Sequence, residues 1–249
     1  MESESCDLSI ITTVLPEKSD YIKETDESIK KIKKKLLKAN ISMEWIVVVD
    51  GENNIPNIRN ADKIITNHSH QGISVSRNKA LNESLGQWIM PLDADDTLQE
   101  EAEQFIKQTL LLPSHIGWVM SNEPPSININ ESEIMSGRLT ELFQKNIVNI
   151  LYPNHVIYKK NSLLNNYLKG WINLPVNEDL GTLLIVSELY NGVIYETPLI
   201  RSRVWGKQEN QSHIRRLNIP FSFEKISEVI TKIRTKEGRE IIALSSKVA

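Results

Sequence analysis

Three carboxylates follow directly on an apolar segment, and this arrangement points most clearly to chemistry. Residues 88–92 read Trp-Ile-Met-Pro-Leu and lead straight into Asp93, Asp95 and Asp96. A short apolar run predicts a buried strand, and the carboxyl ends of strands are where open α/β sheets bind ligands. Mg²⁺ and Mn²⁺ prefer carboxylate oxygens and usually share their coordination with substrate phosphates. The spacing therefore indicates a divalent cation on Asp93 and Asp95 beside a phosphorylated substrate.

A helix start is the alternative explanation for the same acids. Asp95 or Asp96 could cap a helix that enters at residues 97–100, because Asp is among the preferred N-cap residues. The pattern at this one position leaves both explanations open, and the remainder of the chain decides between them.

Strands and helices alternate along the first hundred residues and would position the acids. Segments rich in Val and Ile predict strands, and apolar positions at helical spacing predict helices. The predicted strands cover residues 8–14, 45–51 and 63–65 and the segment that leads into Asp93; one helix starts at residues 25–28, and another spans 74–85. This alternation predicts an α/β fold with mostly parallel strands. Thr13, Asp50 and Asp93 would then lie along one crevice.

The segment Gly72 to Ala80 could add a cation to that crevice. Its glycine and serines stand at a predicted helix entrance, and Arg77 follows within the first turns. Backbone amides and a guanidinium in such a place can bind a phosphate. Taken alone, an arginine at this position is more often a surface residue, and it is the neighbouring Asp-x-Asp that favours a binding role for Arg77.

Together these segments resemble the inverting glycosyltransferases of the GT-A fold, in particular the large family of cellulose, chitin and hyaluronan synthases and many small bacterial sugar transferases. The resemblance rests on Ser-Ile-Ile-Thr-Thr, Val-Val-Val-Asp-Gly, Gly-Ile-Ser-Val-Ser-Arg-Asn-Lys-Ala and Pro-Leu-Asp-Ala-Asp-Asp, in this order, and covers roughly residues 8–205. It implies a Rossmann-like sheet flanked by helices that binds a nucleoside diphosphate sugar, most simply a UDP-sugar, together with Mn²⁺ or Mg²⁺.

The resemblance also implies roles for single residues of the donor side. Asp50 matches an acid that contacts the nucleotide base, Thr13 lines the same pocket, and Arg77 matches a position near the nucleotide. Asp93 would contact the ribose or help to bind the metal, and Asp95 would be its direct ligand. The run Asp50-Gly51-Glu52-Asn53 departs from the family pattern, which often has a second acid and Gly-Ser here. The base and sugar of the donor are therefore left open.

The second half of the chain contributes the catalytic base in this comparison. Residues 171–181 resemble an acceptor-side segment in which an acidic pair opens a helix, here Glu178 and Asp179. We assign Asp179 as the general base that deprotonates the acceptor hydroxyl. The alternative explanation for this acidic pair is an ordinary helix N-terminus, where acids are stabilised by the helix dipole.

A polar stretch that ends at His213 follows the last predicted strand. In relatives a loop of this kind closes over the donor and sometimes carries a histidine ligand, so His213 is a candidate metal ligand and Trp205 a candidate donor contact. A single histidine in a polar loop is more often solvent-exposed, and the same holds for His68 and His70.

Composition limits the remaining possibilities. The chain has 249 residues, a net charge of −3 and one cysteine, Cys6. Such a charge argues against nucleic acid as a partner, and a lone cysteine fits a reducing cytoplasm. There is no signal-peptide pattern and no apolar run of roughly 20 residues that could span a bilayer, although docking onto a membrane surface stays open.

The predicted organisation has three parts. Residues 1–114 form the nucleotide-sugar half, 115–219 the acceptor and catalytic-base half of the same domain, and 220–249 a helical tail. Apolar residues at helical spacing in the tail fit either a packed helix or a homodimer contact. The acceptor would be a small molecule, a glycan or a lipid-linked compound.

Two other functions fit part of the pattern. A metal-dependent nucleotidyltransferase also uses paired acids beside a nucleotide, but it does not need acids that open a long helix. A non-catalytic sugar-nucleotide binding module could keep Asp50 and Asp95 while Asp179 was dispensable. Substitution of Asp179 distinguishes binding from catalysis.

Overall fold

The structure is a computed structural model that describes residues 6–15, 20–51, 57–123, 133–145, 153–174, 177–203 and 213–239, with side chains from 222 onward in the last segment. The strands are β1 (Cys6–Val14), β2 (Met43–Asp50), β3 (Lys63–Asn67), β4 (Gly86–Pro91), β5 (Thr97–Leu98), β6 (Ile116–Ser121), β7 (Glu133–Ile134), β8 (Val156–Lys159), β9 (Asn191–Tyr195) and β10 (Ile200–Arg201). The helices are α1 (Ile22–Lys38), α2 (Ile73–Glu83), α3 (Ala102–Leu110), α4 (Arg138–Gln144), α5 (Lys160–Leu164), α6 (Glu178–Leu189) and α7 (His213–Lys236).

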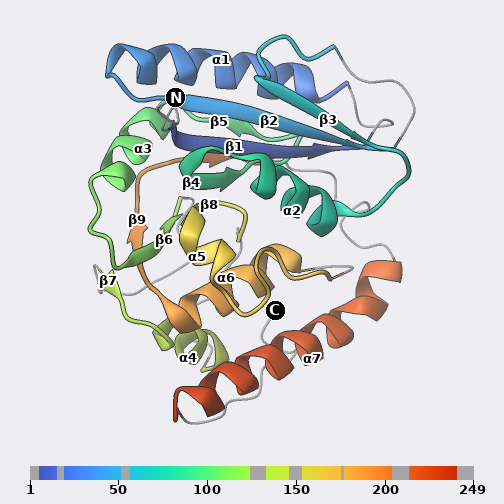
Figure 1. Cartoon of the computed structure of the whole chain (residues 1–249), viewed down its shortest axis with the longest axis vertical. Helices are drawn as coiled ribbons and strands as arrows, with labels where there is room; N and C mark the ends of the chain where they lie inside the picture. Colours follow the sequence, from blue (N-terminus) through green and yellow to red (C-terminus); the bar gives the residue numbers. More distant parts are fainter. Residues whose placement is uncertain are drawn as a thin grey trace.

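An eight-stranded sheet in the order β3-β2-β1-β4-β8-β6-β9-β7 runs through the protein (Figure 1). The four strands predicted in the first half, β1 to β4, are all parallel to one another. Their side chains alternate between two buried layers: Ile46 and Val48 face the core that contains α2, whereas Val47 and Val49 face the core that contains α1. This burial on both faces explains the continuous apolar runs in the sequence, and the predicted α/β class is confirmed.

Helix α1 begins earlier than predicted. The sequence placed its start at Thr25, but the helix begins at Ile22, and Thr25 is buried within it. The Thr25 hydroxyl lies 2.8 Å from the carbonyl oxygen of Ala94 and 2.7 Å from that of Asp96. Thr25, whose side chain is typical of a helix cap, therefore binds the loop after β4 instead of capping α1.

The second half of the sheet is mixed. Strand β8 pairs antiparallel with both β4 and β6, whereas β6 and β9 are parallel. Because β8 pairs with β4, the sheet continues across the predicted boundary between residues 114 and 115. Helix α7 likewise runs across position 219, so the three-part division stays a prediction.

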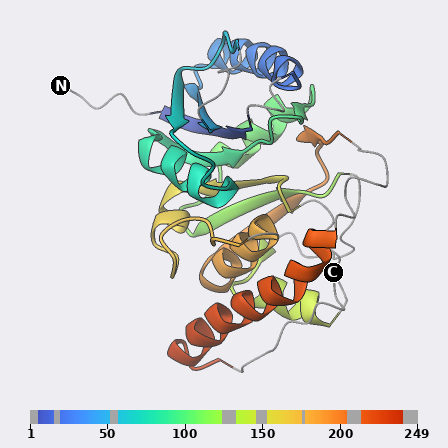
Figure 2. The same cartoon turned by 90° about the vertical axis from the view of Figure 1, so that its right-hand side faces the viewer.

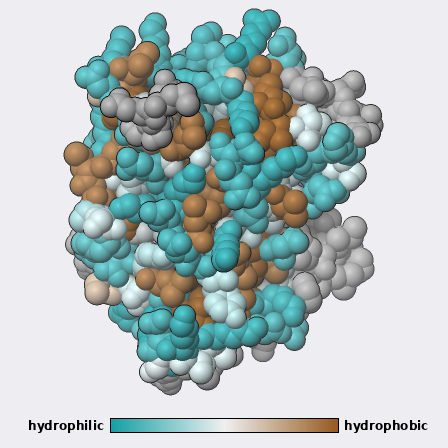
Figure 3. Space-filling view, viewed as in Figure 1, coloured by the Kyte–Doolittle hydropathy of each residue, from teal (hydrophilic) through white to brown (hydrophobic). Residues whose placement is uncertain are grey.

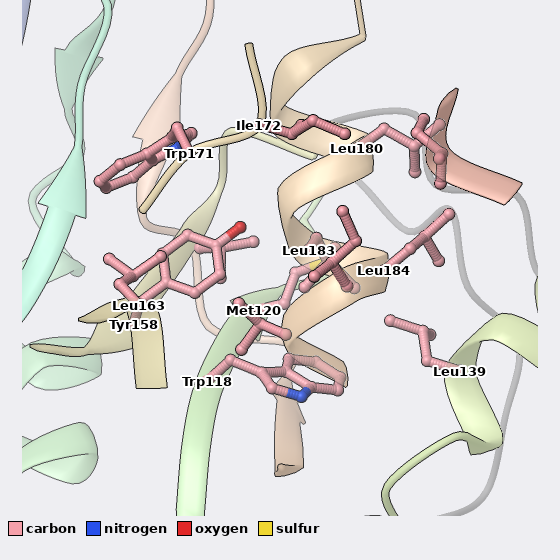
Figure 4. Close-up of a cluster of buried hydrophobic side chains, with 14 of the residues drawn as sticks. Trp118, Met120, Leu139, Tyr158, Leu163, Trp171, Ile172, Leu180, Leu183 and Leu184 are labelled. Carbon is pink, nitrogen blue, oxygen red and sulfur yellow. The ribbon is translucent and has the colours of Figure 1, made fainter. Parts of the chain in front are cut away.

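Helix α6 is buried, as its apolar sequence predicts, and packs between the sheet and the C-terminal part of the chain. Figure 4 shows Leu180, Leu183 and Leu184 of α6 among side chains from β6, β8 and α4. Helix α7 lies against α6 on the other side (Figure 2). Ile226, Ile230 and Ile233 of the C-terminal stripe are buried there, so packing within the chain accounts for this stripe.

The outer surface in the view of Figure 3 is mainly hydrophilic, with hydrophobic residues in small groups. Among the described residues, no helix is long and apolar enough to cross a membrane.

Candidate active site

A cavity of about 760 Å³ lies at the carboxyl ends of β1, β2 and β4. The sequence placed Thr13, Asp50, Asp93 and Asp95 along one rim, and all four line this cavity. The parallel strands bring these residues together because their carboxyl ends meet at one edge of the sheet. The cavity is completed by residues that the sequence did not single out as site residues: Leu15, His70, Gln71, Gly72, Ile73, Ala94, Asn173 and Leu174.

The Asp50 carboxylate is fully buried and surrounded by hydrogen-bond donors. Oδ1 accepts hydrogen bonds from the Asn67 side-chain amide at 2.8 Å and from the Gln71 backbone N–H at 2.9 Å. Oδ2 accepts one from the Gly72 backbone N–H at 2.9 Å and lies 2.9 Å from Nδ1 of His70. Burial by itself would raise the pKa of Asp50, but these donors outweigh it and lower the pKa below its usual value.

The acids after β4 form a loop, residues 93–96, which we call the acid loop. The helix that would have made Asp95 or Asp96 a cap is absent: residues 97–98 form β5, and α3 begins at Ala102. The helix-cap explanation is therefore wrong.

Asp96 anchors the acid loop and is buried. Its carboxylate accepts hydrogen bonds from the Arg203 backbone N–H at 3.0 Å and from the Ser202 hydroxyl and the Asn154 amide, both at 3.1 Å. Burial and the neighbouring charge of Asp93 raise the pKa of Asp96 to about 7. Asp96 thus joins the acid loop to the segment after β10, while Asp93 and Asp95 line the cavity.

Arg77 contacts three carboxylates, and we call Arg77, Asp93, Glu178 and Asp179 the arginine cluster. One guanidinium nitrogen donates to Asp93 at 2.8 Å, and the other donates to Glu178 at 3.2 Å and to Asp179. The Arg77 side chain is only 2% exposed. Arg77 was predicted beside the nucleotide, but it does not line the described cavity. It contacts Asp93 on one side and the acids of α6 on the other, so it connects the cavity wall to α6.

The first turn of α6 carries Glu178 and Asp179, as predicted. Asn177 precedes them in a left-handed backbone conformation with φ of 60°, which Asn tolerates better than most residues. The segment before it is held by α2, because the Asn78 amide accepts a hydrogen bond from the Trp171 backbone N–H at 2.7 Å and donates to its carbonyl at 3.1 Å.

Asp179 has an unusual electrostatic environment. Burial raises its pKa to about 7; the Arg77 charge opposes this shift, whereas Glu178 adds to it. A carboxylate with a pKa near neutrality is suited to accept a proton under physiological conditions. Asp179 does not line the described cavity itself; it lies across Arg77 from Asp93.

Asp93 and Asp95 are suitable ligands for a divalent cation. Burial raises the pKa of Asp93, Arg77 opposes that shift, and the charges of Asp179 and Asp95 add to it. The cavity wall therefore carries an excess of negative charge that a cation would relieve. In the part of the chain that the structure describes, no group of three or more His, Cys, Asp or Glu side chains is arranged to hold a metal. Two carboxylates suffice for Mg²⁺ or Mn²⁺ when substrate phosphates complete the coordination.

Two predicted site residues cannot be placed by their side chains. Trp205 lies outside the described residues, and only the backbone of His213 is described. That backbone forms the first residue of α7 and does not belong to an extended polar loop. His70, which the sequence suggested was a solvated loop residue, lines the cavity and contacts Asp50.

The chain was next compared with known proteins. Residues 9–114 match the sequence model of the family described as Glycosyl transferase family 2. The matched residues include Thr13, Asp50, Asp93 and Asp95 of the cavity. No curated protein sequence matches the chain at a significant level.

Solved structures resemble the chain over most of its length. The structure of S. aureus TarS 1-349 in complex with UDP has a TM-score of 0.61 at 17% identity and covers 91% of this chain and 65% of its own. The complex of the same fragment with UDP-GlcNAc has a TM-score of 0.61 at 16% identity; the match covers 91% of this chain and 66% of the TarS fragment. The mannosyltransferase PcManGT from Pyrobaculum calidifontis, in complex with GDP-Man and Mn²⁺, has a TM-score of 0.51 at 13% identity and covers 97% and 66%.

These similarities show the fold. The chain has the GT-A fold that its motifs predicted, whereas the narrower resemblance to cellulose, chitin and hyaluronan synthases is not confirmed. The chain spans about 65% of the length of the TarS 1-349 structures.

Proposed function

We propose that this protein is a metal-dependent inverting glycosyltransferase that moves a sugar from a nucleoside diphosphate sugar to an acceptor hydroxyl. The observation that carries the proposal is the arginine cluster, in which one guanidinium joins Asp93 at the cavity to Asp179 at the start of α6. The family match over residues 9–114 supports a sugar donor. UDP-sugars are the first donors to test and GDP-sugars the second, because the similar structures contain UDP, UDP-GlcNAc and GDP-Man.

The proposed reaction is a single displacement. Asp179 takes the proton from the acceptor hydroxyl while the hydroxyl oxygen attacks the anomeric carbon, which general-base catalysis accelerates by about 10²–10⁴-fold. The bond from that carbon to the diphosphate oxygen breaks, and its electrons leave with the diphosphate. Attack and departure on opposite faces invert the anomeric centre, so no covalent enzyme intermediate is required.

The other residues of the site bind and orient. Asp95 and Asp93 would hold Mn²⁺ or Mg²⁺, whose contribution is to neutralise charge on the departing diphosphate. We assign Arg77 as a positioning residue, because its guanidinium is already shared among three carboxylates. The acceptor would be a small molecule, a glycan or a lipid-linked compound; a cytoplasmic location and a homodimer stay predictions.

The proposal is tested by comparing wild-type protein with Asp179→Asn. Donor turnover is followed as release of UDP or GDP from a panel of nucleotide sugars, with water as acceptor where no other is known. The variant should keep donor affinity and lose turnover by about 10²–10⁴-fold. Glu27→Gln is a matched control, because this acid is exposed on α1, away from the cavity.

Three outcomes would contradict the proposal. Unchanged turnover in Asp179→Asn would remove Asp179 as the base, and donor binding without turnover in the wild type would favour a non-catalytic binding module. Transfer of the nucleotidyl group in place of the sugar would favour a nucleotidyltransferase.

A further inference from the structure

The Asp50 carboxylate leaves little room for a ligand. A carboxylate offers about four lone-pair positions; Asn67, Gln71 and Gly72 donate to three of them, and Nδ1 of His70 lies 2.9 Å from Oδ2, where it covers the remaining position. If a nucleotide base of the proposed donor donates a ring N–H to Asp50, the role that the family resemblance implies for this acid, it must first displace one of these partners.

The four partners differ in how readily they can leave. Asn67 is buried and its amide is fixed further, because it also donates to the Ser76 hydroxyl at 3.0 Å and accepts from the Lys79 ammonium at 2.8 Å. The donors of Gln71 and Gly72 are backbone N–H groups at the entrance to α2. Only His70 contacts Asp50 through an exposed side chain, which is 67% exposed.

The His70 imidazole lies in open surroundings on the cavity side of Asp50. Its side chain is 67% exposed, and His70 lines the cavity together with Gly72. An exposed imidazole can turn away from the carboxylate without moving the backbone amides of Gln71 and Gly72, which hold other positions on it.

From these contacts we infer that His70 is a displaceable partner of Asp50, which occupies the base-binding position in the empty site and leaves when a base with a ring N–H binds. The inference rests on the proposed function, and it makes His70 a specificity-determining residue. Uracil, through N3–H, and guanine, through N1–H, can replace the imidazole on Oδ2. A base whose ring nitrogen is methylated cannot donate to Asp50, so it does not compete with His70 for this carboxylate.

The test is calorimetric titration of wild type, His70→Ala and His68→Ala with UDP, GDP and their N3-methyl-uridine and N1-methyl-guanosine counterparts. An exposed contact between an imidazole and a carboxylate is weak, so its removal should raise the affinity for UDP or GDP about two- to five-fold. The affinity of the methylated nucleotides should not change. His68→Ala is the matched control, because His68 is an exposed histidine of the same loop that does not line the described cavity.

The possible failures are distinguishable. A loss of UDP or GDP affinity in His70→Ala would mean that His70 binds the nucleotide directly, and an equal gain for methylated and unmethylated nucleotides would mean that it blocks the cavity without competing for Asp50; either result overturns the inference while nucleotide binding survives. If no nucleoside diphosphate binds to any of these proteins, the proposed function fails, and the inference fails with it.

Discussion

Asp50 and Asp93 lie at the carboxyl ends of β2 and β4, on either side of β1, yet their charges are balanced in opposite ways. The Asp50 carboxylate accepts three hydrogen bonds and is contacted by His70, and its pKa is lowered. Asp93 shares one guanidinium with Glu178 and Asp179, and its pKa is raised. The same sheet edge thus provides a carboxylate that stays ionised without a ligand and a group of acids that needs a further cation or a proton. The first arrangement suits neutral N–H groups, and the second suits a metal and an acid–base reaction.

Removal of Arg77 should break the acidic side of this comparison with the largest effect. Arg77→Ala leaves three carboxylates without their shared guanidinium, and loss of one partner from buried ion pairs destabilises by about 3–5 kcal/mol. Urea unfolding measures the change. Arg77→Lys keeps the positive charge but loses the guanidinium that contacts acids on two sides, so it should recover part of the stability. If Arg77→Ala were as stable as the wild type, the arginine cluster would not be held together by this residue.

The pH dependence of turnover should report the raised pKa of Asp179. A base must be deprotonated to act, so turnover should fall about tenfold for each pH unit below the pKa, which lies near 7. Glu178→Gln removes a neighbouring negative charge that raises the pKa of Asp179. The acid limb of the pH profile of turnover should therefore shift to lower pH in this variant. A limb that is unmoved in Glu178→Gln would assign the titration to another group.

Removal of a proposed metal ligand should change donor binding only when metal is present. Titration of UDP or GDP with and without Mn²⁺ should show a metal-dependent gain in the wild type. This gain should fall at least about tenfold in Asp95→Asn. Substitutions of residues that only support metal ligands already lower metal affinity by about 10- to 100-fold. Equal affinities with and without Mn²⁺ in the wild type would contradict metal dependence.

Asp50→Asn should lower the stability of the fold, by less than Arg77→Ala does. Asn offers one acceptor oxygen where Asp50 offers two, so the Gly72 N–H loses its acceptor at a cost of about 1–3 kcal/mol. Because folding lowers the pKa of Asp50, its contribution is present above the unfolded pKa near 3.9 and is lost as the pH falls through the folded value. The stability difference between the proteins should therefore shrink in acid, and a difference that is constant with pH would contradict this.

The parallel half of the fold was predictable because its strands carry uninterrupted apolar runs that end on polar residues. The meeting of Thr13, Asp50 and Asp93 at one cavity follows from that regularity. The second half was harder, because β7 and β10 have only two residues each and β8 has four, which gives too little pattern to detect.

Contacts between distant elements were missed for a different reason. Arg77 is 101 positions from Glu178, and their contact depends on how α2 and α6 pack, which no local pattern records. His70 was expected to be a solvated loop residue, and its side chain is 67% exposed; its contact with Asp50 depends on the path of the loop before α2, which the sequence does not record. The turn at Gly72 was the available signal, since a glycine at a positive φ fixes how the loop passes the strand end.

The way the acid loop is held has a consequence for how this site can diversify. Thr25 contacts the loop through the carbonyl oxygens of Ala94 and Asp96, so two of its anchors are main-chain atoms. These anchors do not depend on the side chains of Asp93 or Asp95. Evolution can therefore change the charge of the loop without changing its path. Substitutions at positions 93 and 95 would adapt the same backbone to different ligands.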